Sequence, residues 1–565
     1  MAIVVALFGA LFVRVAQLQA TSQDRLVAFG EDQRIVQVPL PAPRGTLLDR
    51  NGEPMALSLN RPTIWVDPRE VLAPAATANA LGPVLEMDST RLTDLLTTEG
   101  GFAYLARQVD PETAEVVADL ELAGIHQMDE PARVNPADGL ARSLLGQVDI
   151  DHIGIAGLEQ RFDDRLRGRA GELVVERDLE GNTIASGDRR QVAPVRGQDL
   201  TLTIDRTLQH VAEQALIDQV AAVGAKGGMA VISEPSTGNI LAMANVEADT
   251  AADGSWSGIT VSDNNSAVTG VFEPGSVSKI ITVAAALEDG VATPDDQFDV
   301  PSRVYVDDFE FTDVHEHGTS RYSVTDILTE SSNVGTIMIA REVGEERLDH
   351  YVRAFGFGAP TGLDLPGETA GLLLPLEDWT ATSLSTIALG QGISVTALQT
   401  TTAVNVIANG GTRVAPRIVE AMADDDGESQ PAPPSPAERV VSEQTARQMA
   451  AMMTSVVDEG TGSAAAIDGY PVAGKTGTAR KPLDSGGYED ADGNYHYVAT
   501  FAGFVPANRP ALSVTVVIDE PTSEIYGGTV AAPVFRRLAE EGLRRLGVSP
   551  PAEITNAAAA ADPVG

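Results

Sequence analysis

The chain has 565 residues, of which 43% are hydrophobic, so it is long enough for two or three domains with ordinary cores. Its 80 acidic and 39 basic residues give a formal net charge of −41, which argues against nucleic acid as a partner, since proteins that bind it carry basic patches. The absence of cysteine excludes disulfides and thiolate metal sites.

The chain begins with an unbroken apolar run over residues 1–13, which ends at Arg14. A helix that spans a bilayer needs about 20 apolar residues, so this run is short. It also lacks the basic flank and the small-x-small cleavage site of a signal peptide. We expect residues 1–20 to form an uncleaved membrane anchor whose cytoplasmic start lies upstream. The alternative is a buried N-terminal helix.

Residues 21–222 show the patterns of a mixed α/β domain. Asn51-Gly52 is a hairpin-type turn signal, and strand-like and amphipathic segments alternate after it. The expected elements are strands at 63–67, 171–177 and 199–205 and helices at 90–98, 111–123 and 207–223.

Residues 223–548 predict an α+β fold. The segments 228–233 and 239–244 are almost continuously apolar and flank a Pro-Ser-Thr-Gly turn, which predicts a hairpin buried on both faces. Strands at 497–504 and 512–518 and a helix at 532–546 follow a long helical middle. We therefore expect an antiparallel sheet covered by helices, with an all-helical insert. The Asp-, Ser- and Pro-rich residues 421–437 predict a flexible surface loop, and residues 549–565 a disordered tail.

Ser276 and Lys279 stand three residues apart, just before a helix predicted to end at Gly290. Residues at i and i+3 share one face of a helix, so both side chains would point the same way. A serine hydroxyl needs a base within hydrogen-bond reach, and a lysine serves when burial and nearby cations lower its pKa. The spacing therefore predicts a nucleophile and its base, provided that suitable partners exist.

Two further motifs follow in order along the chain. They are Ser331-x-Asn333 and Lys475-Thr476-Gly477-Thr478. Each has a plain structural interpretation, the first as a helix cap and the second as a loop before a strand. S-x-x-K followed by S-x-N and K-T-G is, however, the signature of penicillin-binding proteins and class A β-lactamases. The order of the three motifs predicts acyl transfer through a serine.

Three other patterns suggest different chemistry without the context it needs. Residues 469–476 match the phosphate-loop pattern, yet Pro482 and nearby glycines disfavour the helix that must start at the Lys-Thr pair. His315 and His317 have no third metal ligand nearby in the sequence, so we expect a polar loop. Residues 490–494 resemble a calcium loop whose glycine comes too early, and they predict the tip of a long hairpin.

Over nearly its full length the sequence resembles the class B penicillin-binding proteins, most closely the septal FtsI-type group (penicillin-binding protein 3). Trp65 and its neighbours in Ile64-Trp-Val-Asp-Pro68 favour the septal over the elongation type. Other family-like stretches are Arg44-Gly45 with 49–52, 157–159 with 162–163, 203–205, 272–276, 390–392, and 526–528 with 532–535. The resemblance implies a membrane anchor over 1–20, a non-catalytic pedestal of the dimerisation type over 21–222, a transpeptidase domain over 223–548 and a tail over 549–565.

The resemblance implies that Ser276 attacks the penultimate D-Ala carbonyl of a peptidoglycan stem peptide and forms an acyl-enzyme that a neighbouring stem amine resolves. Lys279 would be its base, Ser331 a proton relay, and Asn333 would orient Lys279 and the substrate amide. Lys475 would supply positive potential. Thr476, Gly477 and Thr478 would bind substrate, and the N–H groups of Ser276 and Thr478 would form the oxyanion hole. No metal or cofactor is implied.

The resemblance also implies a single-pass protein of the cell membrane, with most of the chain on the extracytoplasmic side. The implied partners are stem peptides, β-lactams, a polytopic FtsW-like glycosyltransferase and division proteins. Four alternatives stay open: an elongation-type relative, a β-lactamase, a β-lactam-sensing receptor and an inactive scaffold. A β-lactamase needs a positioned deacylating base, which we cannot identify in the sequence.

Overall fold

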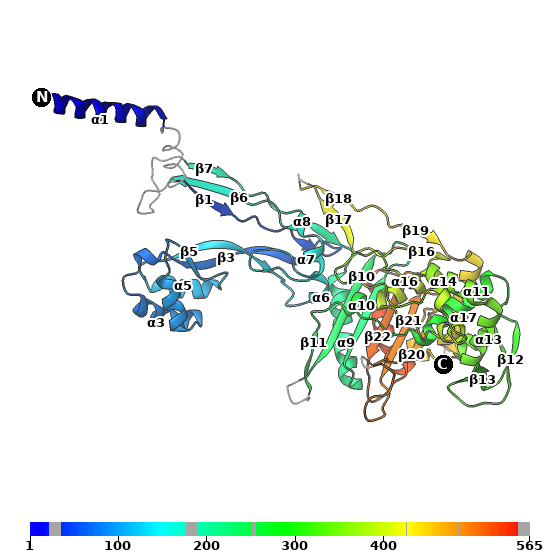
Figure 1. Cartoon of the computed structure of the whole chain (residues 1–565). Coiled ribbons are helices and arrows are strands. Elements are labelled where there is room, and N and C mark those ends of the chain that lie inside the picture. The colour runs from blue at the N-terminus through cyan, green and yellow to red at the C-terminus, as the bar shows by residue number, and fades with distance from the viewer. Residues whose placement is uncertain (22–34, 177–188, 251–255, 425–426, 484–485, 552–565) are drawn as a thin grey trace. The chain divides into compact units, whose positions relative to one another are not determined.

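The computed structural model describes residues 1–21, 35–176, 189–250, 256–424, 427–483 and 486–551 (Figure 1). The chain divides into two compact units. Unit 1 comprises Met1–Thr46, Leu57–Val134 and Asp164–Gln198, and unit 2 comprises Leu47–Ala56, Asn135–Asp163 and Asp199–Gly565.

Unit 1 contains two antiparallel sheets. Strands β1 (Ile35–Leu40), β6 (Gly171–Glu176) and β7 (Arg189–Val192) form one of them. In the other, residues 57–66 of the long strand β3 (Pro54–Val66) pair with β4 (Ala103–Ala106) and β5 (Ile125–Val134). The remaining elements of this unit are α1 (Ala2–Thr21), η1 (Pro68–Glu70), α3 (Pro74–Leu85), α4 (Ser89–Leu96) and α5 (Pro111–Asp119), and α8 (Asp163–Leu166) begins at its border.

A small apolar core holds the helices of unit 1 against β3. Ile64 and Val66 of the strand lie in one cluster with Leu81 of α3, Leu92 of α4 and Val117 of α5. Helix α5 ends four residues earlier than the sequence predicted. The cause is local, because Glu121 and Gly124 both have positive φ values, 45° and 81°, which a helix cannot accommodate.

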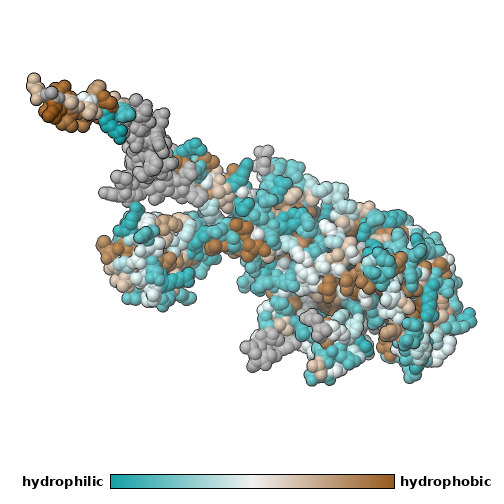
Figure 2. All heavy atoms as spheres, viewed as in Figure 1, coloured by the Kyte–Doolittle hydropathy of each residue, from teal (hydrophilic) through white to brown (hydrophobic). Residues whose placement is uncertain are grey.

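Helix α1 carries the apolar run at the start of the chain. Side chains such as Phe8, Leu11 and Phe12 on it are exposed, and Figure 2 shows the helix as largely hydrophobic. Among the residues that the structure describes, however, no helix is both long enough and apolar enough to cross a membrane. The expected membrane anchor over residues 1–20 is therefore helical but not supported as a membrane span.

Unit 2 is built on a six-stranded antiparallel sheet in the order β11-β10-β9-β22-β21-β20. Its strands are β9 (Gly227–Ser233), β10 (Ile240–Thr250), β11 (Trp256–Val261), β20 (Ala473–Arg480), β21 (Tyr497–Val505) and β22 (Leu512–Asp519). The predicted hairpin of β9 and β10 and the two C-terminal strands are confirmed.

Helices cover both faces of this sheet, as the α+β prediction required. Val514 and Val516 of β22 pack in one cluster with α9 (Arg206–Val223) and α19 (Ala532–Arg545). The alternate residue Ser513 faces the other way and hydrogen-bonds Asn405 of α16 (Ala397–Ala408). Successive side chains of a strand point to opposite faces, and every side chain of β22 from Leu512 to Ile518 is buried, so both faces of the strand are covered.

The insert that carries both serine motifs is not all-helical, and that prediction was wrong. Two small antiparallel sheets lie between α11 (Lys279–Glu288) and α12 (Val324–Thr329): β12 (Gln297–Val300) pairs with β15 (Ser320–Ser323), and the hairpin of β13 (Arg303–Val306) and β14 (Phe309–Thr312) lies in the connection between them. Most side chains of these strands are exposed or half-buried, so the strands lack the long apolar runs from which buried strands were recognised. The other helices are α10 (Ser266–Thr269), α13 (Asn333–Val343), α14 (Glu345–Ala354), α15 (Ser383–Ala388) and α17 (Glu443–Asp458), with η2 (Gly275–Ser278), η3 (Leu376–Asp378) and η4 (Ser463–Ala465).

The predicted surface loop over 421–437 also contains strands. Strand β17 (Val419–Ala423) pairs with β18 (Ser429–Pro431) and with β8 (Leu200–Leu202), which in turn pairs with β2 (Leu47–Leu48). Strand β16 (Thr412–Val414) pairs with β19 (Ala437–Arg439). The predicted tail lies mostly outside the described residues. The short helices α6 (Arg142–Leu145), α7 (Gly157–Arg161) and α18 (Gly527–Val530) complete the unit.

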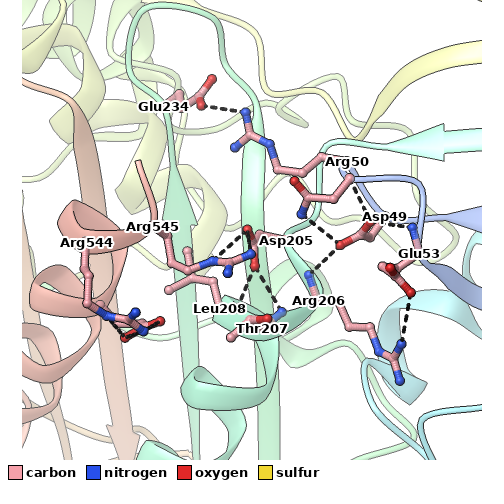
Figure 3. Close-up of polar contacts among 12 residues, drawn as sticks. Asp49, Arg50, Glu53, Asp205, Arg206, Thr207, Leu208, Glu234, Arg544 and Arg545 are labelled. Atoms are coloured by element: carbon pink, nitrogen blue, oxygen red, sulfur yellow. Dashed lines mark hydrogen bonds and ion pairs between the residues drawn. The ribbon is translucent and has the colours of Figure 1, made fainter. Parts of the chain in front are cut away.

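Two aspartates tie the segment Leu47–Ala56 to the helices of unit 2 (Figure 3). Asp49 Oδ1 accepts the backbone N–H groups of Asn51 and Glu53, and its Oδ2 accepts that of Arg206 at 3.2 Å. Asp205 caps α9 by accepting two further backbone N–H groups, and it also binds the side chain of Arg545 at the end of α19. One network thus joins three parts of the sequence.

Candidate active site

Ser276 lies on the single 3₁₀ turn η2, and Lys279 is the first residue of α11 directly after it. The i, i+3 spacing therefore does place them one turn apart. Gly275 opens the turn with φ +54°, and a Cβ there would lie 3.3 Å from Ala479 Cβ on β20. The nucleophile segment is thus in close contact with the strand that carries Lys475.

Lys279 is fully buried and points to the second motif. Its Nζ donates to Asn333 Oδ1 at 2.8 Å, to the carbonyl oxygen of Ser331 at 2.5 Å and to Ser331 Oγ at 3.3 Å. Among the described residues, no hydrogen bond joins Lys279 Nζ to Ser276 Oγ. Hydrogen bonds of this kind are often long in a free enzyme and tighten with substrate.

Burial lowers the pKa of Lys279 well below its usual value, because an ammonium group loses its hydration in the interior. The positive charge of Lys475 lowers this pKa further, whereas the carboxylate of Asp313 acts in the opposite direction. A lysine with a lowered pKa can exist as a neutral amine and accept a proton.

The Ser331–Asn333 motif is held by an acidic residue that the sequence analysis missed. Asp313 Oδ1 accepts the backbone N–H of Asn333 at 2.5 Å, and its Oδ2 accepts the hydroxyl of Ser332 at 2.8 Å. Ser331 itself has φ +58°, a left-handed conformation that is uncommon outside glycine and tends to occur at functional sites. The clamp fixes this conformation and directs the Ser331 carbonyl oxygen at Lys279.

The third motif lies on β20, the last strand in the sheet order. Lys475 has no exposed surface, and burial lowers its pKa to about 7. Thr476 Oγ1 hydrogen-bonds Thr461 Oγ1 at 2.8 Å, and Thr478 Oγ1 accepts the N–H of Gly527 at 3.1 Å. At Gly477 a Cβ would lie 2.8 Å from the carbonyl oxygen of Pro274, so only glycine lets β20 approach the nucleophile segment this closely.

The structure thus brings all eight predicted site residues into unit 2 and packs their three segments against one another.

The competing motifs do not form the sites they suggest. Lys475 and Thr476 lie within a strand, not at the start of a helix, which excludes the phosphate-loop geometry. His317 Nε2 lies 3.0 Å from Asp313 Oδ2, and Asp313 in turn binds the Ser331–Asn333 motif, so His317 stabilises this motif indirectly. Asp490 accepts the N–H of Asn494 in a turn at the hairpin tip, as predicted.

Comparison with known families agrees with this geometry. The model of the penicillin-binding protein transpeptidase domain matches residues 228–540, and that of the penicillin-binding protein dimerisation domain matches residues 39–202. The chain belongs to the class B penicillin-binding proteins. The two family models together account for most of this penicillin-binding protein, and the first covers the three motifs.

Similar proteins come from several bacteria. Stage V sporulation protein D of Bacillus subtilis is 34% identical over 544 residues, covering 95% of this chain and 83% of its own. The peptidoglycan D,D-transpeptidase FtsI of Escherichia coli is 35% identical over 554 residues, covering 96% and 90%. A crystal structure of penicillin-binding protein 3 from Mycobacterium tuberculosis in complex with aztreonam has 29% identity and a TM-score of 0.69, covering 91% and 98%.

Proposed function

We propose that this protein is a serine D,D-transpeptidase that cross-links peptidoglycan stem peptides through an acyl-enzyme on Ser276. The observation that carries the proposal is the fully buried Lys279 amine, which is bonded to Ser331 and Asn333 one turn from Ser276. The names of similar proteins, among them the D,D-transpeptidase FtsI, support the same reaction.

In the first half-reaction, Ser276 Oγ attacks the penultimate D-Ala carbonyl while Lys279 Nζ takes its proton. The N–H groups of Ser276 and Thr478 stabilise the oxyanion. The bond to the terminal D-Ala then breaks, and Lys279 returns the proton through Ser331 Oγ to the leaving amine. Asn333 orients Lys279 and the substrate amide. Lys475 supplies positive potential, and the hydroxyls of Thr476 and Thr478, on either side of Gly477, hold the terminal carboxylate.

In the second half-reaction, the amine of a neighbouring stem attacks the acyl-enzyme, and the serine hydroxyl is restored. The same site reacts with β-lactams, whose strained amide replaces the D-Ala-D-Ala bond. Incubation with a stem-peptide donor and a D-amino acid acceptor should release D-Ala and form the exchanged peptide. Rapid hydrolysis of penicillin without exchange would instead indicate a β-lactamase.

The cellular role that we propose is septal wall synthesis during division. The sequence around Trp65 and the similarity to FtsI support it, whereas the similarity to a sporulation protein shows that related chains serve other stages. In this proposal, the N-terminal helix anchors the protein in the cell membrane, and the catalytic domain, which begins near residue 223, lies on the extracytoplasmic side. The proposed partners are an FtsW-like glycosyltransferase and division proteins. Depletion in its own cells should give filaments without septa, and rounded cells would favour the elongation type.

A further inference from the structure

His317 lies between two hydrogen-bond acceptors in the connection from β14 to β15. Its Nε2 lies 3.0 Å from Oδ2 of Asp313, and its Nδ1 lies 2.5 Å from the carbonyl oxygen of Gly318. The hydroxyl of Ser320 lies farther from Nδ1, at 3.4 Å. An ionised carboxylate and a carbonyl group only accept hydrogen bonds, whereas a neutral imidazole has a single N–H. Both contacts are therefore satisfied together only when the ring carries two protons and a positive charge.

Asp313 is the charged group that faces this ring. The acid nearest in sequence, Glu316, pairs with Arg303 on β13 instead, and the ring of Tyr322 on β15 lies 6.0 Å from the imidazole. The hydrogen bond to Asp313 raises the pKa of His317 above its usual value, in agreement with the two contacts of the ring. His317 and Asp313 thus form an ion pair whose charge depends on pH.

Asp313 connects this ion pair to the base of the active site. Its Oδ1 accepts the backbone N–H groups of Asn333 and Val334 at 2.5 and 3.0 Å, and its Oδ2 accepts the hydroxyl of Ser332 at 2.8 Å. The side chain of Asn333 in turn accepts a hydrogen bond from Lys279 Nζ at 2.8 Å. Asn333 therefore bridges the carboxylate and the buried amine.

The charges around Lys279 act in opposite directions. The positive charge of Lys475 on β20 lowers the pKa of Lys279, and the carboxylate of Asp313 raises it. The side chains of Asp313 and His317 are 8% and 19% exposed, so water screens this pair less than it screens a surface pair. An imidazolium at His317 offsets part of the field of the carboxylate, and a neutral ring does not. The proton on His317 thus helps to keep Lys279 in its neutral, basic form.

We propose that Asp313 and His317 are positioning residues that together set the strength of Lys279 as a base, through the charge of the pair and its hold on Asn333. The inference rests on the proposed function, because it assumes that Lys279 takes the proton of Ser276. Neither Asp313 nor His317 takes part in the acyl transfer. When His317 loses its proton, the carboxylate is no longer offset, and Lys279 holds its own proton more strongly.

The first variant removes the negative charge of the pair. Acylation of the full-length protein by a fluorescent penicillin is followed from about pH 5 to about pH 9. Asp313→Asn keeps an acceptor for the backbone N–H of Asn333 but has no charge, so the pKa of Lys279 falls further. The rise in acylation rate with pH should then move to lower pH by about half a unit or more. A lower rate at every pH without this shift would overturn the inference.

The second variant removes the positive charge of the pair. His317→Gln keeps an N–H group that can reach Asp313, but it carries no charge at any pH. Its acylation rate should be lower than that of the wild type by about threefold or more at acidic pH, which corresponds to a shift of about half a unit. The two rates should converge at alkaline pH, where the wild-type ring is neutral as well.

The matched control is His315→Gln, at an exposed histidine two residues away, which should leave the rate unchanged at every pH. Thermal unfolding shows whether each variant is folded, and His317→Gln decides the question alone if Asp313→Asn does not fold. A rate for His317→Gln that equals the wild-type rate at all pH values, or that is lowered uniformly, would overturn the inference. A folded wild type that takes up no label at any pH would instead overturn the proposed function.

Discussion

Two lysine side chains are fully buried in this site, and the positive charge of Lys475 disfavours that of Lys279. Such burial is expensive, because a cation loses its hydration when it leaves water. In this site the loss of hydration lowers the pKa of Lys279, so its amine is available as a base. Stability and reactivity are therefore opposed at the same atoms, as is common in active sites.

Lys475→Met should shift the pH dependence of acylation. Removing the charge of Lys475 raises the pKa of Lys279, so the rise in acylation rate with pH should move to higher pH. The rate constant for acylation by a fluorescent penicillin, measured from about pH 5 to about pH 9, tests this shift directly. An unchanged profile with a lower amplitude would show that Lys475 acts only on the substrate.

The same substitution should stabilise the fold. The pKa of Lys475 is about 7 in the folded protein and 10.5 ordinarily, so the unfolded chain binds more protons between these values. The gain in unfolding free energy is then full below pH 7 and fades as the pH rises towards 10.5. Since one pKa unit corresponds to about 1.4 kcal/mol, we expect the gain to exceed 1 kcal/mol at neutral pH. Lys226→Met, at an exposed lysine, should bring no gain in urea denaturation.

At the residue scale, the sequence was sufficient to select the motif residues but not their supports. Ser276, Lys279, Ser331, Asn333 and Lys475 are recognisable because their spacing is local. Asp313 and His317 have no such signal for their role. Asp313 reaches the helix start 20 residues on, and Asn333 in turn reaches Lys279 across 54 positions. Contacts at these separations depend on the folded chain and not on any sequence period.

At the scale of elements, the approach of the loop after α15 to η2 determines the position of the nucleophile. Gly390 has φ +75°, and a Cβ there would lie 2.2 Å from the carbonyl oxygen of Gly275. Gly390→Ala should therefore lower stability by roughly 2–4 kcal/mol and acylation at least about tenfold, because the backbone before Ser276 must move.

Gly290→Ala is the matched control for that prediction. Gly290 has a similar φ of +67°, but nothing lies within 4 Å of a Cβ added to it. It should cost about 1 kcal/mol through the left-handed conformation alone and leave acylation intact. Thermal unfolding of both variants reports the backbone strain at the substituted glycine. Penicillin labelling reports whether the segment before Ser276 has moved. Equal labelling by the two variants would contradict the assigned role of Gly390.

Elements with strong periodicity were predictable, and short exposed ones were not. The almost continuously apolar runs of β9 and β10 correspond to a hairpin buried on both faces, and β21 and β22 lie where strands were expected. The strands β12 to β15 have only four residues each. Their pairing depends on neighbours, so the sequence led us to expect helices throughout the insert.

At the scale of the whole molecule, Asp205 ties the N-terminus of α9 to the C-terminus of α19 (Figure 3). Asp205→Ala removes a cap worth about 1 kcal/mol and leaves Arg545 without its carboxylate, so unfolding in urea should become easier by roughly 2–4 kcal/mol. The labelling rate of the folded protein should not change. Asp218→Ala, which breaks an exposed pair with Arg537, should cost at most about 1 kcal/mol. Equal losses in the two variants would contradict this assignment.

Asp205 also contributes to acid sensitivity. Burial alone would raise its pKa, but the hydrogen bonds from Arg545 and from the N–H of Leu208 lower the pKa below 3.8 overall. Its contribution to stability is therefore present above the unfolded pKa and is lost as the pH falls through the folded one. Asp205→Asn should remove this contribution to the pH dependence of the unfolding free energy, measured by urea denaturation at acidic and neutral pH.

The overall α+β architecture, with a transpeptidase unit after a non-catalytic one, was predictable because its motifs recur in one family. The boundary near residue 222 stays a prediction. The structure also assigns Leu47–Ala56 and Asn135–Asp163 to the second unit, although they precede that boundary. The sequence patterns predicted one boundary between the units and offered no sign that the second unit is discontinuous.

The most direct test of the mechanism is labelling with a fluorescent penicillin, followed over time in the full-length protein. Wild type and Ser278→Ala should both take up a stable label, since Ser278 lies on the same turn but is buried and unbonded among the described residues. Ser276→Ala should take up none while keeping the wild-type Tm. Label on a folded Ser276→Ala variant would contradict the assignment of the nucleophile, and label that vanishes within minutes from the wild type would contradict transpeptidation.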